Sequence, residues 1–249
     1  MVMRRFYIDD PRKINDDTVR ITGDEAGHIL RVLRLKKNDC LILFDQQGNI
    51  YKGFIVATNR NEVKVKITEK QRKDASVKTG IILCQAIIRP KKMDFIVQKS
   101  TELGVSGIIP FYSSRSIPRW ENAKAAGKVA HWQKIVAASI KQSGIRQVPV
   151  VENITDFSEL IEKDFKGYTK LILWENESQQ NLKNIFSAGG VPEKMLFAVG
   201  PEGGFSEDEI LKAKQRGFVI VGLGKNILRS ETAPIALLAI IRYERGDLG

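Results

Sequence analysis

The sequence predicts an α/β protein in two parts, a small β-rich domain followed by a larger domain built on a mostly parallel sheet. Short strand-like runs crowd the first 72 residues, whereas apolar runs alternate with amphipathic helical segments from residue 81 onward. Near-continuous apolar strands between helices are typical of a parallel sheet that helices cover on both faces. We therefore expect two domains, residues 1–72 and 73–249, with a polar linker at residues 71–76.

The first domain is expected to form a compact barrel, because its strands are short and closely spaced. Strands are predicted at residues 4–8, 41–44, 51–57 and 63–67, with a hairpin turn at residues 46–49. The last of these runs alternates Val or Ile with Lys, so one of its faces is apolar and the other basic. Residues 24–35 have helical spacing, with arginines opposite the apolar side.

The second domain alternates strands and helices. Strands are predicted at residues 81–88, 107–112, 171–174, 195–199 and 218–221, and helices at 91–103 and 121–143. Ser206 and Glu209 have the spacing of a capping box, and Gly217 is a suitable end for the helix that follows. Pro234 suits the first turn of a last helix.

Two glycine-bearing loops of the second domain each follow an apolar strand and precede a helix. One is Gly200-Pro-Glu-Gly-Gly-Phe-Ser206, and the other is Leu223-Gly-Lys-Asn-Ile-Leu-Arg-Ser-Glu-Thr-Ala233. Glycine lets a ligand approach bare backbone, and two such loops at the carboxyl ends of neighbouring strands form a ligand crevice. Neither loop has the spacing of a Walker or dinucleotide fingerprint, and tight turns that need glycine are the structural alternative.

Charge indicates a polyanionic partner. The chain of 249 residues carries 40 Lys and Arg against 29 Asp and Glu, a net charge of +11. Residues 1–72 hold 15 of the basic and 10 of the acidic residues, so their net charge is +5, against +6 for the other 177 residues. A surface of this kind attracts nucleic acid through its phosphates, and a merely solvated basic surface is the alternative.

Other functional classes have little support in the sequence. No apolar run approaches the roughly 20 residues of a membrane span, and the N-terminus lacks an apolar signal core, so we expect a cytoplasmic protein without membrane attachment. Cys40 and Cys84 lie in apolar runs, which predicts buried thiols. With only two histidines and no ligand-like spacing, no metal site is expected.

The two loops taken together are far more specific than either alone, and with other motifs they resemble the RsmE family. These are SPOUT-class methyltransferases of small-subunit ribosomal RNA. The resemblance covers nearly the whole chain. It is carried by the two loops, by His28-x-x-Arg-Val-Leu-Arg-Leu35, by Lys92-Met-Asp-Phe-Ile-Val-Gln-Lys-Ser-Thr-Glu-Leu-Gly-Val105, by Ser114-Arg-Ser116, by Gln142-Ser143 and by Val148-Pro149.

The resemblance implies a PUA-like RNA-binding β-barrel over residues 1–72 and a SPOUT domain with a C-terminal trefoil knot over residues 73–249. It also implies a homodimer, S-adenosyl-L-methionine as methyl donor, and methylation of uracil N3 at one uridine of 16S ribosomal RNA. The donor is expected to lie in the knot against backbone groups of three loops. The cofactor-binding residues carried over to this chain are Leu173, Trp174, Glu175, Gly200, Pro201, Glu202, Gly203, Leu223, Gly224, Ile227, Leu228 and Ala233.

Two residues of the last loop are candidates for catalysis. Uracil N3–H is weakly acidic, and when it loses its proton the negative charge spreads onto O2 and O4. Arg229 is the candidate that stabilises this charge. Glu231 either positions Arg229 or accepts the proton. Alignment of N3 with the sulfonium methyl supplies much of the rate of such an in-line displacement.

Basic residues elsewhere are candidates for contact with RNA. They are Arg4, Arg5, Arg31, Arg34, Arg89, Lys92 and Arg115. Two departures from the family pattern concern the remaining motifs. Ser230 stands where the family usually has Thr, which keeps the hydroxyl, and Ile145 displaces the expected arginine to Arg146.

Two other functions are weighed against this one. A SPOUT enzyme with another RNA target would put the methyl group on a different nucleoside. A non-catalytic RNA-binding factor of ribosome assembly would keep the fold and fail to bind S-adenosyl-L-methionine. The intact glycine loops favour the enzyme.

Overall fold

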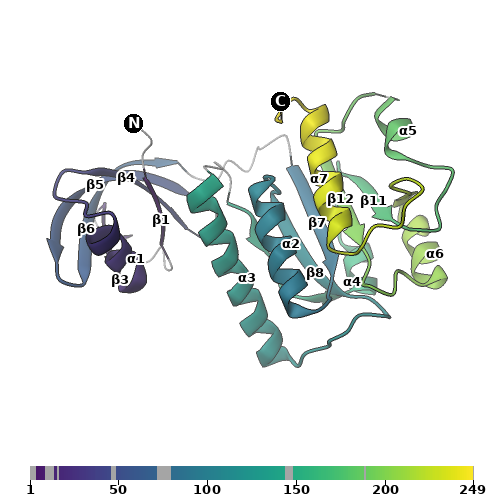
Figure 1. Cartoon of the computed structure of the whole chain (residues 1–249), viewed down its shortest axis with the longest axis horizontal. Coiled ribbons are helices and arrows are strands. Elements are labelled where there is room, and N and C mark those ends of the chain that lie inside the picture. The colour runs from purple at the N-terminus through teal and green to yellow at the C-terminus, as the bar shows by residue number, and fades with distance from the viewer. Residues whose placement is uncertain are drawn as a thin grey trace. The chain divides into compact units, whose positions relative to one another are not determined.

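Figure 1 shows the computed structural model of the chain, which describes residues 4–8, 14–15, 17–45, 49–71, 80–143, 148–187 and 189–248. The chain divides into two compact units. One comprises Met1–Ser76 with Ala137–Val148, and the other Val77–Val136 with Pro149–Gly249. Apart from Gln71, the predicted linker lies outside the described residues, so the boundary between residues 72 and 73 stays a prediction.

The N-terminal unit is a half-barrel of six strands in the order β1-β4-β5-β6-β3-β2. Its strands are β1 (Arg4–Ile8), β2 (Ile14–Asn15), β3 (Thr18–Thr22), β4 (Cys40–Asp45), β5 (Ile50–Asn59) and β6 (Glu62–Gln71). The β1–β4 pair is parallel and the other pairs are antiparallel. Between the described residues no ladder joins β1 to β2, so the sheet stays open where the sequence predicted a compact barrel.

Strands of the half-barrel bury alternate residues. Val63, Val65 and Ile67 of β6 are at most 5% exposed, and the lysines between them are not buried, so the predicted apolar and basic faces are confirmed. The pairing of β5 with β6 shifts register after Lys52, next to Gly53. A Cβ atom at Gly53 would collide with the backbone of β6, so this bend requires glycine.

The predicted helix at residues 24–35 is shorter than expected. It comprises a helical turn, α1 (Gly23–Gly27), and a π-helical turn, η2 (His28–Val32). The backbone N–H of Leu33 donates to the carbonyl of His28 at 2.9 Å, the wide i to i+5 spacing of a π-helix. Arg34 then has a φ of 51°, a left-handed conformation that ends the helix before Leu35.

The second unit contains a sheet of seven strands in which every ladder is parallel. The order along the sheet is β10-β8-β7-β12-β11-β13, and β9 pairs with β8. The strands are β7 (Gly80–Ala86), β8 (Gly107–Tyr112), β9 (Val150–Val151), β10 (Thr155–Asp156), β11 (Thr169–Leu173), β12 (Lys194–Val199) and β13 (Val219–Val221). The predicted parallel sheet is thereby confirmed.

Helices cover both faces of this sheet. The helices after residue 80 are α2 (Pro90–Glu102), α3 (Asn122–Ser143), α4 (Phe157–Glu162), α5 (Leu182–Ser187), α6 (Glu207–Gln215) and α7 (Thr232–Glu244), of which α3 has residues in both units. In Figure 1, α2 and α7 lie on the near face and α4 and α6 on the far face. Buried residues of α4 and α6, with Phe205, pack against Cys84, Phe111, Leu196 and Ile220 in one apolar cluster.

The two cysteines differ, and the prediction of two buried thiols is wrong for one of them. Cys84 is fully buried within β7, where desolvation raises the pKa of its thiol well above the ordinary value. Cys40 is exposed at the start of β4, because the buried part of that strand begins only at Leu41.

The carboxylate of Glu209 caps the start of α6 and also accepts a hydrogen bond from the loop after β8. Ser206 and Glu209 form the predicted capping box, in which the Ser206 N–H donates to Glu209 Oε2 at 2.9 Å. The same carboxylate accepts from the backbone N–H of Ser114, at 2.8 Å, in the loop after β8. Burial by itself raises the pKa of Glu209, but the hydrogen bonds lower it by more, so the net shift is downward.

We expect Glu209→Gln to lower the free energy of unfolding at pH 7 by about 1–2 kcal/mol, because a buried charge-assisted network is lost. The folded-state pKa of Glu209 is depressed, so its stabilisation is present above the ordinary value of 4.5 and is lost as the pH falls through the folded pKa. Denaturant unfolding of both proteins from neutral to acidic pH measures the difference. A difference that stays constant with pH would contradict this role of the charge.

Candidate active site

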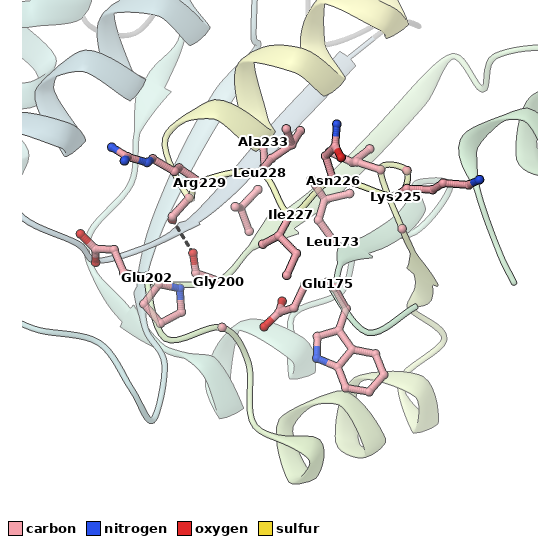
Figure 2. A pocket seen from close by; sticks show the side chains of 18 of the residues that line it. Leu173, Glu175, Gly200, Glu202, Lys225, Asn226, Ile227, Leu228, Arg229 and Ala233 are labelled. Atoms are coloured by element: carbon pink, nitrogen blue, oxygen red, sulfur yellow. Dashed lines mark hydrogen bonds between the residues drawn. The ribbon is translucent and has the colours of Figure 1, made fainter. Parts of the chain in front are cut away.

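A cavity of about 360 Å³ lies at the carboxyl ends of β11, β12 and β13 (Figure 2). This volume is at the lower end of the range that small-molecule sites occupy. Three loops enclose it, one after each strand, and the start of α2 adds one side chain. The lining residues are Lys92, Leu173, Trp174, Glu175, Val199, Gly200, Pro201, Glu202, Gly204, Gly222, Leu223, Gly224, Lys225, Asn226, Ile227, Leu228, Arg229, Ser230 and Ala233.

The structure brings nearly all of the predicted cofactor-binding residues to this cavity. Gly203 is the exception, since its neighbours on both sides line the cavity and it does not. Of the two catalytic candidates, Arg229 lines the cavity and Glu231 does not. Sequence reasoning missed Val199, Gly204 and Gly222, and it included Lys225, Asn226 and Ser230 only as part of the third cofactor loop, Leu223 through Ala233. All of these lie within or beside the predicted loops. They could have been predicted from their position next to the predicted residues in the sequence.

The cavity combines an apolar centre with carboxylates. Figure 2 shows Leu173, Ile227 and Leu228 grouped around its centre, and Glu175 pointing into the same space. Ile227 is 80% exposed, an unusual state for an isoleucine that has apolar neighbours. Arg229 and Lys225 direct their charged ends away from the centre (Figure 2). The wall can therefore take a flat apolar group and a positive charge.

Two glycines allow the loops to approach one another. At Gly222 a Cβ atom would collide with the carbonyl oxygen of Glu177, because residues 177–181 run beside the start of the last loop. At Gly204 the φ is +67°, and a Cβ atom there would collide with the carboxylate of Glu175. A side chain at Gly222 would displace the backbone of residues 177–181, and one at Gly204 would strain the backbone and push the Glu175 carboxylate aside.

A buried hydrogen-bond relay ties two of the loops to the sheet. The Ser230 hydroxyl donates to the carbonyl of Gly200 at 2.6 Å, and Gln85 Nε2 donates to the Ser230 hydroxyl at 3.3 Å. Gln85 is fully buried at the end of β7. Sequence reasoning missed Gln85, although a glutamine in an otherwise apolar strand was a usable signal. The serine that replaces the usual family threonine keeps the hydroxyl this relay needs.

A cluster of opposite charges lies at the edge of the cavity. Lys92 Nζ is 3.0 Å from Glu231 Oε2 and 3.3 Å from Glu202 Oε1. Partial burial raises the pKa of Glu231, but hydrogen bonds from its own backbone N–H and from Lys92 lower it by more. The hydrogen bond to Glu231 raises the pKa of Lys92, and Glu202 adds to this effect. Both side chains are therefore charged at neutral pH.

Glu231 therefore has a different partner from the one that the sequence suggested. Among the described residues it forms an ion pair with Lys92, and no ion pair joins it to Arg229. Since Lys92 is the third residue of α2, the cluster connects that helix to two of the cavity loops. Lys92 was expected to contact RNA, and the structure places it against the cavity instead of on an open surface.

The other RNA-binding candidates fall into two groups. Arg115 donates from Nη1 to the carbonyl of Gly203 at 2.7 Å, and Arg89 is exposed immediately before α2. In the N-terminal unit Arg4, Arg31 and Arg34 are exposed. Arg5 is partly buried, with its guanidinium 5.7 Å from the centre of the Phe44 ring, and burial lowers its pKa. The departure at Ile145 and Arg146 lies outside the described residues.

We expect Ser230→Ala to weaken the binding of S-adenosyl-L-methionine about tenfold, a loss of about 1.4 kcal/mol. The variant leaves the Gly200 carbonyl without its buried donor, so the two loops lose their fixed spacing. Ser230→Thr is the matched control, because it keeps the hydroxyl. Titration calorimetry measures both affinities, and equal affinity of the alanine variant and wild type would show that the relay does not support the site.

Family profiles and full-length relatives both indicate an RNA methyltransferase. The profile of a family described as an RNA methyltransferase domain matches residues 75–242, and that of an RNA methyltransferase PUA domain matches residues 21–68. The ribosomal RNA small subunit methyltransferase E of Bacillus subtilis is 30% identical over 98% of this chain and 100% of its own length. Its namesake from Buchnera aphidicola is 32% identical over 98% of this chain and 97% of its own.

Solved structures agree with these matches. Ribosomal RNA small subunit methyltransferase E from Neisseria gonorrhoeae, bound to S-adenosyl methionine, aligns with a TM-score of 0.78 at 36% identity, over 97% of this chain and 98% of that one. A putative methyltransferase from Legionella pneumophila in complex with the same cofactor aligns with a TM-score of 0.79 at 27% identity, over 98% of both chains.

The predicted α/β fold class is thereby confirmed as an N-terminal PUA-like half-barrel followed by an RNA methyltransferase domain built on a parallel sheet. The family match extends over most of the chain, and the relatives are similar along their whole length. The chain belongs to the RsmE family of ribosomal RNA small subunit methyltransferases.

Proposed function

We propose that this protein transfers a methyl group from S-adenosyl-L-methionine to N3 of a uracil in 16S ribosomal RNA of the small subunit. The observation that carries the proposal is the three-loop cavity at the ends of β11, β12 and β13. It contains eleven of the twelve residues expected to bind the cofactor. Relatives of similar fold, at 36% and 27% identity, were solved with this cofactor bound.

The lining residues fit the proposed cofactor. Leu173, Leu223 and Leu228 supply apolar surface for the faces of an adenine ring, and the loop backbone offers N–H and C=O groups for its edge. Glu175 and Glu202 supply negative charge, which suits the ammonium and sulfonium groups of the ligand. Gly200 and Gly204 leave the wall open to close approach by the ligand.

The cofactor supplies an electrophilic methyl group on a sulfonium, and the protein must orient the base and stabilise its charge. The loop residue Arg229 stabilises the negative charge that N3 deprotonation places on a uracil carbonyl oxygen. Its guanidinium is exposed and directed away from the cavity centre in Figure 2, so it has to turn toward the base when RNA binds. The exposed Arg4, Arg31 and Arg34 hold RNA phosphates.

The first test is incubation of the protein with S-adenosyl-L-methionine and undermethylated small ribosomal subunits, followed by nucleoside mass spectrometry. We expect 3-methyluridine to appear. A methyl group on another nucleoside would mean a different RNA target for the same fold. Neither methyl transfer nor cofactor binding would instead favour a non-catalytic role in ribosome assembly.

We expect Arg229→Ala to lower the rate of methyl transfer about 100- to 1,000-fold, because one donor to the developing oxyanion is removed. Cofactor affinity should stay within about threefold of wild type, since the guanidinium points away from the cavity centre. Arg216→Ala is the control, because Arg216 pairs with Glu162 at 2.6 Å at the end of α6. Turnover of Arg229→Ala at the wild-type rate would remove this residue from the mechanism.

We also propose a homodimer, a C-terminal trefoil knot and a cytoplasmic location, as in the family that the sequence resembles. Among the described residues, no helix is long and apolar enough to cross a membrane. The α2–α7 face supports the dimer, because Phe95, Ile240 and Tyr243 are 44%, 40% and 69% exposed there. An isolated chain seldom exposes several large apolar side chains on neighbouring helices.

We expect Ile240→Glu to raise the dissociation constant of the dimer at least about tenfold, because a carboxylate would have to be buried in an apolar contact. Leu211→Glu is the matched control, since Leu211 is 59% exposed on α6, which covers the opposite face of the sheet. Sedimentation velocity over a range of concentrations measures both. An unchanged dimer with the first variant would place the interface elsewhere.

A further inference from the structure

Lys92 is held at the edge of the cavity by segments from three parts of the chain. Its side chain starts from α2, and its ammonium contacts Glu202 after β12 and Glu231 before α7, at 3.3 and 3.0 Å. Two carboxylates from separate loops fix the place of a flexible lysine more narrowly than one would. The side chain is still 30% exposed, so it is not sealed away from a ligand.

The ammonium group has capacity left for a ligand. A lysine carries three N–H donors and no acceptor. Glu202 and Glu231 form ion pairs with this ammonium and can engage at most two of its donors in this arrangement, so at least one is available to an acceptor that enters the cavity lined by Lys92. The pairing also raises the pKa of Lys92, so the group stays a donor at alkaline pH.

The proposed reaction places negative charge on two oxygens of the uracil ring, and a single cation cannot donate to both of them. N3 of uracil lies between two carbonyl groups, and loss of its proton puts negative charge on both O2 and O4. Arg229 can serve one of these oxygens. Lys92 lines the same cavity from a different element, so it can serve the other oxygen.

We propose that Lys92 is a second catalytic residue, which donates a hydrogen bond to a uracil carbonyl oxygen as N3 loses its proton. Glu202 and Glu231 are then positioning residues that hold its ammonium. This inference rests on the proposed function. The N3 proton passes to water, and the N3 electron pair forms the bond to the methyl carbon. The carbon–sulfur bond breaks, and its electron pair stays on sulfur, which becomes a neutral thioether.

The test is the single-turnover rate of Lys92→Met on small subunits, measured from about pH 6 to about pH 10. We expect a rate on the order of 100-fold lower at neutral pH, and a rate that continues to rise to higher pH than in wild type, because N3–H is less acidic without the ammonium. Affinity for S-adenosyl-L-methionine should stay within about threefold. A merely structural role would lower the rate equally at every pH and weaken cofactor binding with it.

Two controls separate chemistry from folding. Lys99→Met removes a lysine of the same helix whose carboxylate partner, Glu102 at 2.8 Å, is not part of the cavity, and it should leave the rate unchanged. Subunits reconstituted with RNA that carries 5-fluorouridine, whose N3–H is more acidic, should recover much of the rate lost in Lys92→Met. Equal losses with uridine and 5-fluorouridine would overturn the proposal.

Glu231→Gln gives a second, independent variant. If Glu231 were the proton acceptor, its loss would leave N3 deprotonation to water and hydroxide, so the rate would rise more steeply with pH than in wild type. As a positioning residue its replacement should lower the rate about tenfold and leave that rise in place. If wild type forms 3-methyluridine and Lys92→Met matches it at all pH values, only this inference fails. If wild type forms none, the proposed function fails as well.

Discussion

Three loops start at the same level of the sheet because Leu173 pairs with Val199 on one side and with Val221 on the other. Each of these residues is the last of its strand, so β12, β11 and β13 end together. Parallel strands with this register deliver their loops to one edge, and the cavity follows from that arrangement. A shift of one residue in either ladder would move a loop away from the other two.

Above this shared level, two kinds of polar contact set the spacing of the loops. The Gln85–Ser230–Gly200 relay is buried and made of neutral groups, so water does not compete for its hydrogen bonds and it is insensitive to pH near neutrality. The contacts of Lys92 with Glu202 and Glu231 are partly exposed, and solvent weakens them. The relay is therefore suited to holding the loops at a fixed spacing. The charged cluster is suited to contact with a ligand that binds in the cavity and dissociates from it.

The sequence predicted the elements of the second domain closely, because buried parallel strands and amphipathic helices have strong periodic signals. The strand predicted at residues 107–112 coincides with β8, and the helix predicted at 91–103 differs from α2 by one residue at each end. The helix at 24–35 was predicted too long, because the π-helical turn and the left-handed Arg34 are backbone features without a periodic signal.

The part of the candidate site that lies within the glycine-bearing loops could be predicted from the sequence. Partners that come from distant segments were not predictable, because no spacing rule connects Gln85 to Ser230 or Lys92 to Glu231. The exposed Cys40 was missed for a related reason. A strand pattern shows which residues alternate, but it does not show where along the strand burial starts.

Glu209 has a consequence for local motion. One carboxylate closes the start of α6 and also holds the backbone of Ser114, next to the Arg115 whose side chain reaches Gly203. Fraying of that helix end therefore removes the acceptor that holds the β8 loop, so the opening of the two segments is coupled. The two segments should behave as a single cooperative unit, with amide hydrogens that exchange with solvent at a common opening free energy.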